Sequence, residues 1–189
     1  MKLLTYPQDA ALLARKARPV REDEFGSQAL EDFGRELATL MLDRHALGLA
    51  ATQVDTCAPD GDAWAVFAIR VREDHYAVMC NPVITLRAAA RLGPEACLSF
   101  ESVVETLSAP DQLALRFRNL RGNHGEMMFS GLHARAANHE IEHLNGMTML
   151  HRMSQAKRAL FLKAVQKRRH KLATMTHVTA QPPGPRTVA

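Results

Sequence analysis

The segment His139-Glu140-Ile141-Glu142-His143 combines residue types and a spacing that suit metal chemistry. On a helix, two histidines four positions apart lie on one face, about 5–6 Å from each other, so both imidazoles can reach one metal ion. Glu140 follows the first histidine directly and could act as a base toward water bound to that ion. The alternative is a solvated helix whose histidines are partnered by Glu140 and Glu142.

A catalytic site of this kind needs a third protein ligand and one open coordination position. Cys97, in the segment Glu95-Ala96-Cys97-Leu98-Ser99, is a candidate because its neighbours are small or polar and do not form an obvious core strand. His133 and His151 could also be ligands, although neither stands in a recognisable motif. We expect the other two cysteines to be small, buried hydrophobic residues.

The composition fits one globular domain. The chain has 189 residues, of which 47% are apolar and 23% charged, and at this size roughly 70% of the unfolded surface can be buried. A disordered chain is excluded, and no apolar run approaches the ~20 residues of a membrane-spanning helix. Three cysteines are too few for a disulfide framework, so we expect a cytoplasmic chain with reduced thiols and no membrane contact.

The net charge of +4 is unevenly distributed along the chain. Residues 155–171 hold seven basic residues and no acidic one, so the remainder carries a net charge of −3. We expect an amphipathic helix over 154–172, for which a solvated basic face is the more common role and docking on ribosomal RNA the functional alternative. Residues 173–189 include a Pro-rich end and are expected to form a disordered tail.

The hydrophobic pattern predicts an α+β fold. Apolar residues at helical spacing follow Ser27, a plausible N-cap, and predict a helix that ends near Asp43 to His45. Apolar or alternating segments predict strands over 64–71, 76–80, 83–86, 113–117 and 126–129. From Gly131 the period is helical again, and Asn145-Gly146 suits its end. We therefore expect antiparallel strands packed around a C-terminal helix that carries the two histidines.

Three segments resemble, in order and separation, the signature motifs of peptide deformylases. They are Gly48-Leu49-Ala50-Ala51-Thr52-Gln53, Glu95-Ala96-Cys97-Leu98-Ser99 and the segment from His139 to Gly146. Tyr6-Pro7 near the start and Asn81-Pro82 before a strand also match, so the resemblance spans roughly residues 3–170. It implies a monomeric, peptide deformylase-like domain over residues 1–172 that includes the basic helix.

The resemblance implies a metal-dependent amidohydrolase. Its reaction would remove the N-formyl group from the N-terminal methionine of nascent peptides and release formate. Cys97, His139 and His143 would hold one divalent metal ion, which in this family is commonly Fe(II), with Zn, Ni or Co also able to occupy the site. The sequence alone does not distinguish these ions, because a Cys-His-His set suits several of them.

The resemblance also implies roles for residues around the metal. Glu140 would take a proton from water and later pass it to the departing amine. The oxyanion would accept hydrogen bonds from the side chain of Gln53 and the backbone N–H of Leu98. Gly48 would pair with the substrate backbone as an added strand does. The pocket for the substrate side chain would be lined by Leu47, Leu132, Arg135 and Ala136.

Four features depart from the family pattern. Ala46 and Ala96 stand where the family has glycine, and a positive φ at Ala46 would be strained. Arg44-His45 stand where the family usually has acidic residues. Arg135 lies one helical turn before His139, in a region that is apolar in typical members. Its guanidinium either reaches solvent along the pocket wall or meets an anion, in which case the pocket is narrowed or accepts a polar side chain.

These departures leave two alternative functions open. One is a related metallo-deacylase with an altered preference for the substrate side chain. The other is a degenerate relative that binds the ribosome through Lys157–Lys171. Retention of the three ligands, Glu140 and Gln53 argues against the second, because a binding module needs none of them. A general metalloprotease is less favoured, since Cys97 would then have no role.

Overall fold

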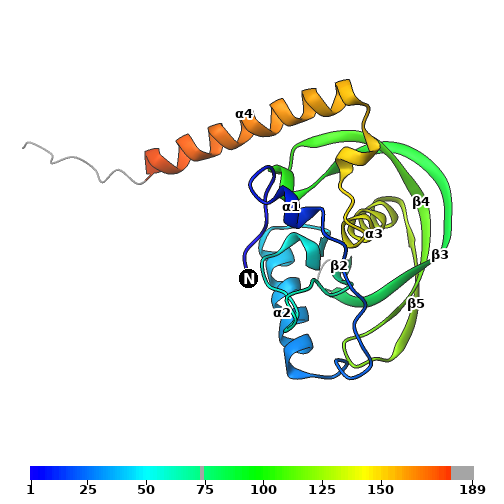
Figure 1. Ribbon diagram of the computed structural model, residues 1–189. Helices are drawn as coiled ribbons and strands as arrows, with labels where there is room; N and C mark the ends of the chain where they lie inside the picture. The colour runs from blue at the N-terminus through cyan, green and yellow to red at the C-terminus, as the bar shows by residue number, and fades with distance from the viewer. Residues whose placement is uncertain (73–74, 180–189) are drawn as a thin grey trace, which may run out of the picture.

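The computed structural model describes residues 1–72 and 75–179. It consists of one five-stranded antiparallel sheet, in the order β1-β2-β3-β4-β5, together with four α-helices. Figure 1 shows the long strands β3 and β4 curving around α3, while α2 lies on the other side of the molecule and α4 extends away from it. The predicted α+β class, with antiparallel strands around a metal-site helix, is confirmed.

The elements have the following bounds. The strands are β1 (Gly48–Ala50), β2 (Val66–Arg72), β3 (His75–Ala96), β4 (Val104–Arg118) and β5 (His124–Ser130). The α-helices are α1 (Ala10–Leu13), α2 (Gln28–Asp43), α3 (Gly131–Leu144) and α4 (Gln155–Thr179). Short 3-10 turns cover Ala51–Gln53, Leu98–Phe100 and Met149–Arg152.

Strand β3 is much longer than the sequence pattern predicts. The expected break at Asn81-Pro82 does not end the strand, because the pairing with β4 shifts register there and then continues to Ala96. Asn81 adopts φ 50° and its side chain exchanges hydrogen bonds of 2.8 and 2.9 Å with the backbone of Val20. The predicted strands 76–80 and 83–86 are therefore parts of one irregular strand. Residues 87–96, which were not predicted as strand, extend it up to Cys97.

Helices α2 and α3 are positioned by their buried faces. The predicted N-cap at Ser27 is confirmed, because its Oγ accepts a hydrogen bond from the backbone N–H of Leu30 at 3.3 Å. Helix α2 buries its apolar face against β1 and β2. Helix α3 packs against four strands and presents fully buried Ala134 and Ala137, whose small side chains allow the helix to approach the sheet closely.

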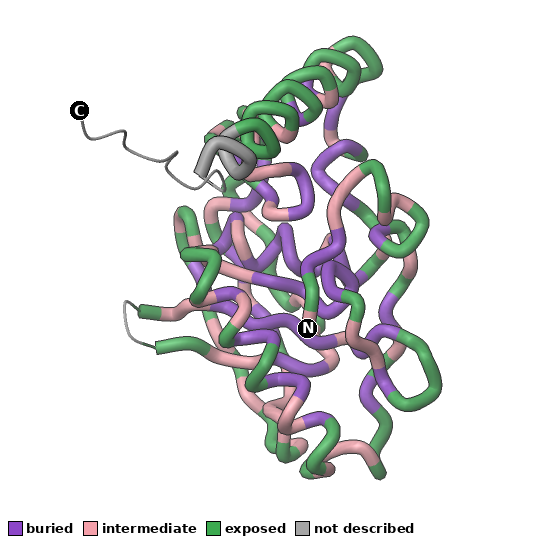
Figure 2. The backbone as a smooth tube through the Cα atoms, turned by 90° about the vertical axis from the view of Figure 1, so that its left-hand side faces the viewer, coloured by how far each residue is buried: buried purple, intermediate pink, exposed green. Residues whose placement is uncertain are grey.

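Helix α4 is attached to the domain through a narrow apolar contact. Phe161 and Val165 are buried against Phe100 and its neighbours, whereas most other described residues of α4 are exposed, as Figure 2 shows. The helix continues to Thr179, so the prediction that a tail begins at residue 173 is wrong for 173–179. The rest of that predicted tail, 180–189, lies outside the described residues. No described helix combines the length and apolarity needed to cross a membrane.

Candidate active site

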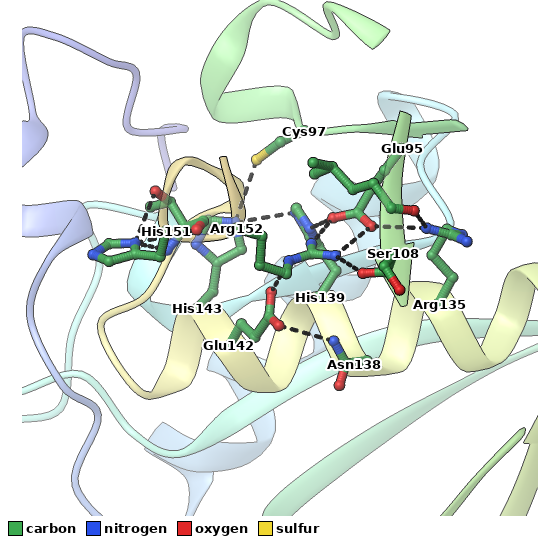
Figure 3. A network of polar contacts seen from close by, with 12 residues as sticks. Glu95, Cys97, Ser108, Arg135, Asn138, His139, Glu142, His143, His151 and Arg152 are labelled. Atoms are coloured by element: carbon green, nitrogen blue, oxygen red, sulfur yellow. Dashed lines mark hydrogen bonds and ion pairs between the residues drawn. The ribbon is translucent and has the colours of Figure 1, made fainter. Parts of the chain in front are cut away.

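Cys97, His139 and His143 meet in the interior between the end of β3 and helix α3 (Figure 3). The Sγ atom of Cys97 lies 3.3 Å from Nε2 of His143, and that nitrogen lies 3.2 Å from Nε2 of His139. All three residues are buried. The structure thus brings together the three residues that the sequence singled out as metal ligands.

The donor atoms of this group fit a divalent metal ion. Around a tetrahedral ion with metal–N of about 2.0–2.1 Å and metal–S of about 2.3 Å, donor atoms stand roughly 3.3–3.6 Å apart, close to the observed separations. The Nδ1 atom of His139 lies 2.7 Å from the carboxylate of Glu95, which directs the opposite ring nitrogen toward the other ligands. The other candidate histidines are not in the group: His151 bonds to the backbone of Thr148, and His133 lies elsewhere on α3.

The buried carboxylate of Glu95 is surrounded by donors (Figure 3). Besides His139, it accepts from Nη1 of Arg135 at 3.4 Å and from Nη1 of Arg152 at 3.1 Å, and the other Arg152 nitrogen contacts it as well. Burial by itself raises the pKa of Glu95, but the hydrogen bonds and charges of His139 and Arg152 outweigh it and lower the pKa to about 2. The carboxylate therefore stays ionised and holds the His139 ring in place.

Arg135 is part of this buried network and does not reach solvent. Its guanidinium donates to the carbonyl oxygens of Leu107 at 2.9 Å and Arg91 at 2.8 Å, and the residue is 7% exposed. Gly93 leaves the space for it, because a Cβ there would lie 2.8 Å from Nη2. Of the two alternatives for this guanidinium, the solvent-reaching one is wrong: the β3–β4 pair covers this part of α3, and Arg135 meets an anion, which is Glu95 and not a substrate group.

Glu140, which follows His139 on α3, has a different environment. It is buried, and its Oε2 atom has no hydrogen-bond partner among the described residues. Burial raises the pKa of Glu140 to about 7; His139 and the Ala50 backbone counteract this, whereas the charge of Glu95 adds to it. The side chain approaches β1 at Gly48, where a Cβ would lie only 2.6 Å from Oε1. Gly48 therefore allows this carboxylate to face the open space beside the ligands.

Two further donors lie near the ligands. The Oε1 atom of Gln53 accepts from the backbone N–H of Ala50 at 3.0 Å. This contact orients the amide nitrogen toward Ser99 Oγ at 3.2 Å and Cys97 Sγ at 3.4 Å. Leu98 begins a 3-10 turn, so its own backbone N–H has no partner within that turn.

A cleft of about 330 Å³ leads from the surface to the ligands and Glu140. It is lined by every residue predicted to contact substrate, namely Leu47, Gly48, Leu132, Arg135 and Ala136, and also by Gln53 and Leu98. Arg44 and His45 line it too, although the sequence marked them only as unusual. The left-handed residue before β1 is His45, with φ 51°, and not Ala46, so the expected strain at Ala46 does not arise.

The partners of Glu95 were missed from the sequence. Arg135 and Arg152 lie 40 and 57 positions away from Glu95 along the chain. They come from α3 and from the turn after it, and no local pattern links them to the strand that carries Glu95. The one signal for this network in the sequence is Arg135, which stands on the same face of α3 as His139 and His143.

Comparisons with known proteins agree with this geometry. The family model for polypeptide deformylase matches residues 1–159. Peptide deformylase 2 of Xanthomonas axonopodis pv. citri is 29% identical over 173 residues, covering 92% of this chain and 98% of the relative. The peptide deformylase of Acidobacterium capsulatum is 30% identical over 167 residues, with coverage of 87% and 93%. The structure of a class I type b peptide deformylase from Acinetobacter baumannii, bound to Met-Ala-Ser, matches with a TM-score of 0.72 and 27% identity, covering 81% of this chain and 98% of that one. The chain therefore belongs to the peptide deformylase family.

Proposed function

We propose that this chain removes the N-formyl group from the N-terminal methionine of nascent peptides, with Cys97, His139 and His143 holding the divalent ion. The observation that carries this proposal is the convergence of one sulfur and two imidazole nitrogens beside a buried carboxylate that has a free oxygen. A divalent ion held there would lower the pKa of bound water and polarise the formyl oxygen. Fe(II) is the proposed ion on the basis of the family resemblance, and Zn, Ni and Co suit the same donors.

Glu140 is the proposed proton carrier. Glu140 lines the cleft, its Oε2 atom has no hydrogen-bond partner among the described residues, and Gly48 leaves room for its Oε1 atom. In this role the carboxylate takes a proton from the attacking water and delivers it to the nitrogen of the peptide as the C–N bond breaks. The products are formate and a free N-terminal amine.

Gln53 and Leu98 are the proposed donors to the negative charge that develops on the formyl oxygen. The Gln53 amide is oriented by Ala50 before substrate arrives, and it lies 3.4 Å from Cys97 Sγ, at the centre of the site. The backbone N–H of Leu98, which has no partner within its 3-10 turn, belongs to the residue directly after Cys97. A donor that needs no reorganisation is typically worth 10²–10³ in rate.

The peptide is proposed to bind along the outer edge of β1. This strand is at one end of the sheet order. The Leu47 carbonyl accepts from the Arg70 N–H on β2 at 2.8 Å, so alternation directs the backbone groups of Gly48 away from β2 and toward the cleft. The Acinetobacter baumannii relative was solved with the tripeptide Met-Ala-Ser bound, which supports a peptide as the ligand of this chain. Leu47, Leu132, Ala136 and the stem of Arg135 would surround the first side chain.

The alternative of a deacylase with a shifted preference is not favoured. It was based on Ala46, Ala96 and Arg135. Ala46 has no positive φ, and the Arg135 guanidinium is occupied by Glu95 and two carbonyl oxygens.

We further propose a monomer in the cytoplasm, where nascent peptides are made, that contacts ribosomal RNA through α4. Three basic residues of α4 are bound to the body of the domain: Lys157, Arg158 and Arg169. The exposed basic residues left for RNA are Lys163, Lys167, Arg168 and Lys171. Replacing these four with glutamine should reduce salt-sensitive cosedimentation with ribosomes while formate release from short peptides is retained. Unchanged cosedimentation would contradict this contact.

The experiment that tests the proposed function combines metal analysis with formate release. Protein purified without oxygen should carry about one divalent ion per chain and release formate from formyl-Met peptides. Cys97→Ala and His143→Ala should lose the ion, while Cys57→Ala, in a half-buried loop outside the ligand group, should keep it. Full metal retention in Cys97→Ala, or no formate from the metal-loaded protein, would contradict the proposal.

A further inference from the structure

The outer end of the cleft carries two adjacent basic side chains. Arg44 is the C-cap residue of α2, and His45 follows in a left-handed conformation that turns the chain toward β1. Both line the cleft that contains Cys97 and Glu140, and both are exposed. Neither side chain makes a hydrogen bond or an ion pair with another residue in 1–72 or 75–179. Their donors are therefore free for a ligand.

The two ends of the cleft differ in charge. Its two carboxylates, Glu95 and Glu140, are buried at the inner end, beside the metal ligands. No exposed acidic side chain lines the cleft among the described residues, and Asp43, which precedes Arg44, is not part of its wall. A ligand that leaves the cleft at this end therefore meets positive charge without a compensating carboxylate.

The position of each residue of a bound peptide can be estimated by counting along the segment that precedes β1. Gly48 contacts Glu140 at the inner end, whereas His45 and Arg44 lie three and four residues earlier, at the mouth. A peptide whose formyl group lies at Glu140 must run outward, antiparallel to this segment, and extended chains advance about 3.3 Å per residue. By this count its first residue lies opposite Gly48, its third opposite Ala46, two residues from Arg44, and its fourth opposite His45, directly beside Arg44.

We propose that Arg44, assisted by His45, is a specificity-determining residue that favours formylated peptides with aspartate or glutamate at the third or fourth position. The proposal rests on the deformylase function proposed above and specifies its substrates further. The guanidinium offers paired donors to a carboxylate, and the imidazole of His45 offers one more N–H. Because both groups are exposed, solvent weakens the contact, and the preference is moderate.

The test compares kcat/KM for formate release by the metal-loaded enzyme on matched peptides. The first set is formyl-Met-Ala-Glu-Ala amide with its glutamine and lysine counterparts, and the second set places the same changes at the fourth position. The C-terminal amide removes the carboxylate of the peptide end. At one of the two positions the glutamate peptide should be processed roughly two- to fivefold faster than the glutamine peptide, and the lysine peptide more slowly. About 1 M salt should bring these ratios close to one.

Variants at Arg44 separate recognition from its structural role at the end of α2. Arg44→Gln should abolish the preference for glutamate, and Arg44→Glu should reverse the order so that the lysine peptide is processed fastest. Loss of a favourable cation at a helix C-terminus would lower stability, but it would not reorder the peptides. The matched control is Arg87→Gln, which removes an exposed arginine of β3 outside the cleft and should keep the wild-type order.

The outcomes distinguish this proposal from the function on which it rests. Equal rates for the three peptides at both positions, with formate still released, would overturn the specificity proposal and leave deformylation standing. Retention of the glutamate preference in Arg44→Glu would likewise overturn it. Absence of formate release from every peptide would overturn both proposals.

Discussion

Glu95 and Glu140 are two buried carboxylates that flank the same histidine, yet their surroundings are opposite. Glu95 accepts hydrogen bonds from His139, Arg135 and Arg152, and its pKa is lowered to about 2. Glu140 has an oxygen without a partner among the described residues, and burial raises its pKa to about 7. Burial alone therefore does not decide the state of a carboxylate; the number of donors around it does.

The contrast separates two proposed roles: one carboxylate holds a metal ligand in place, and the other takes part in the reaction. A carboxylate whose oxygens already accept several hydrogen bonds is held rigidly and cannot accept a further one from substrate or water. A buried carboxylate with an unpaired oxygen can still accept a hydrogen bond, although it lowers the stability of the fold. Such groups are typical of functional sites. The comparison thus supports the proposed roles, in which Glu95 holds His139 in place and Glu140 carries protons.

The largest expected effect is on turnover when Glu140 is changed. Because Glu140 is not a proposed ligand, Glu140→Gln should keep the metal but lower kcat by about 10²–10⁴, the usual cost of removing a general base. Metal content and formate release measure the two effects separately. Glu142→Gln is the matched control: that residue pairs with Arg152 and Asn138 and does not line the cleft, so it should lose far less. Near-normal activity of Glu140→Gln would show that Glu140 does not carry the proton, and the proposed difference in role between Glu95 and Glu140 would be wrong.

The two carboxylates should also give opposite pH dependence of stability in metal-free protein. The lowered pKa of Glu95 contributes stability above its ordinary value of 4.5, and this is lost as the pH falls toward 2. The raised pKa of Glu140 has the opposite sign: stability is lost as the pH rises from 4.5 to about 7. Each change is on the order of 3 kcal/mol, since one pKa unit corresponds to about 1.4 kcal/mol.

Urea unfolding across this pH range measures these slopes. Glu95→Gln should flatten the curve below pH 4.5, and Glu140→Gln should flatten it between pH 4.5 and about 7. If the unfolding free energy of a variant changes with pH as steeply as that of the wild type, the replaced carboxylate is not responsible for the pH dependence.

A smaller effect is expected on metal affinity when Glu95 is changed. Glu95→Gln removes the charge that orients His139, and loss of such an outer partner typically weakens metal binding 10–100-fold. Competition with a chelator measures this directly and does not depend on activity. Glu105→Gln, on the neighbouring strand β4 and paired with Lys157, should bind the ion as the wild type does. Equal affinity in Glu95→Gln would show that His139 is held by the fold alone.

The smallest expected effect comes from Arg135. Arg135→Met removes the side-chain donor from one buried and one partly buried carbonyl oxygen, which should lower the free energy of unfolding by roughly 1–3 kcal/mol. Metal affinity should fall less than in Glu95→Gln, because Arg152 still contacts Glu95. Thermal unfolding measures the first effect, with exposed Arg121→Met as the control. A wild-type melting temperature would contradict the buried network.

Features that depend on neighbours in the chain could be predicted from the sequence. The spacing of His139 and His143 places both rings on one helical face in any context. The hydroxyl of Ser27 caps the helix that follows it, and the apolar period after it identifies the buried face. These are local properties, because a helix forms its hydrogen bonds within about four residues.

Features that depend on pairing between distant segments could not be predicted. A strand has no internal hydrogen bonds, so its length is decided by its partners. β3 continues through Asn81-Pro82 because β4 pairs with it from Cys80 to Ala96. That pairing covers Arg135 and turns an expected surface cation into a buried support for Glu95.

Residue types at short spacing are thus enough to identify which atoms in this chain can bind a metal and which carboxylate stands next to them. Contacts between distant segments place Cys97 beside the two histidines, surround Glu95 but not Glu140 with hydrogen-bond donors, and bring Arg44 and His45 to the same cleft. The physical reason is that ligand identity is a property of residue types at short spacing. Burial and partner number are set by contacts between residues that lie 40 or more positions apart.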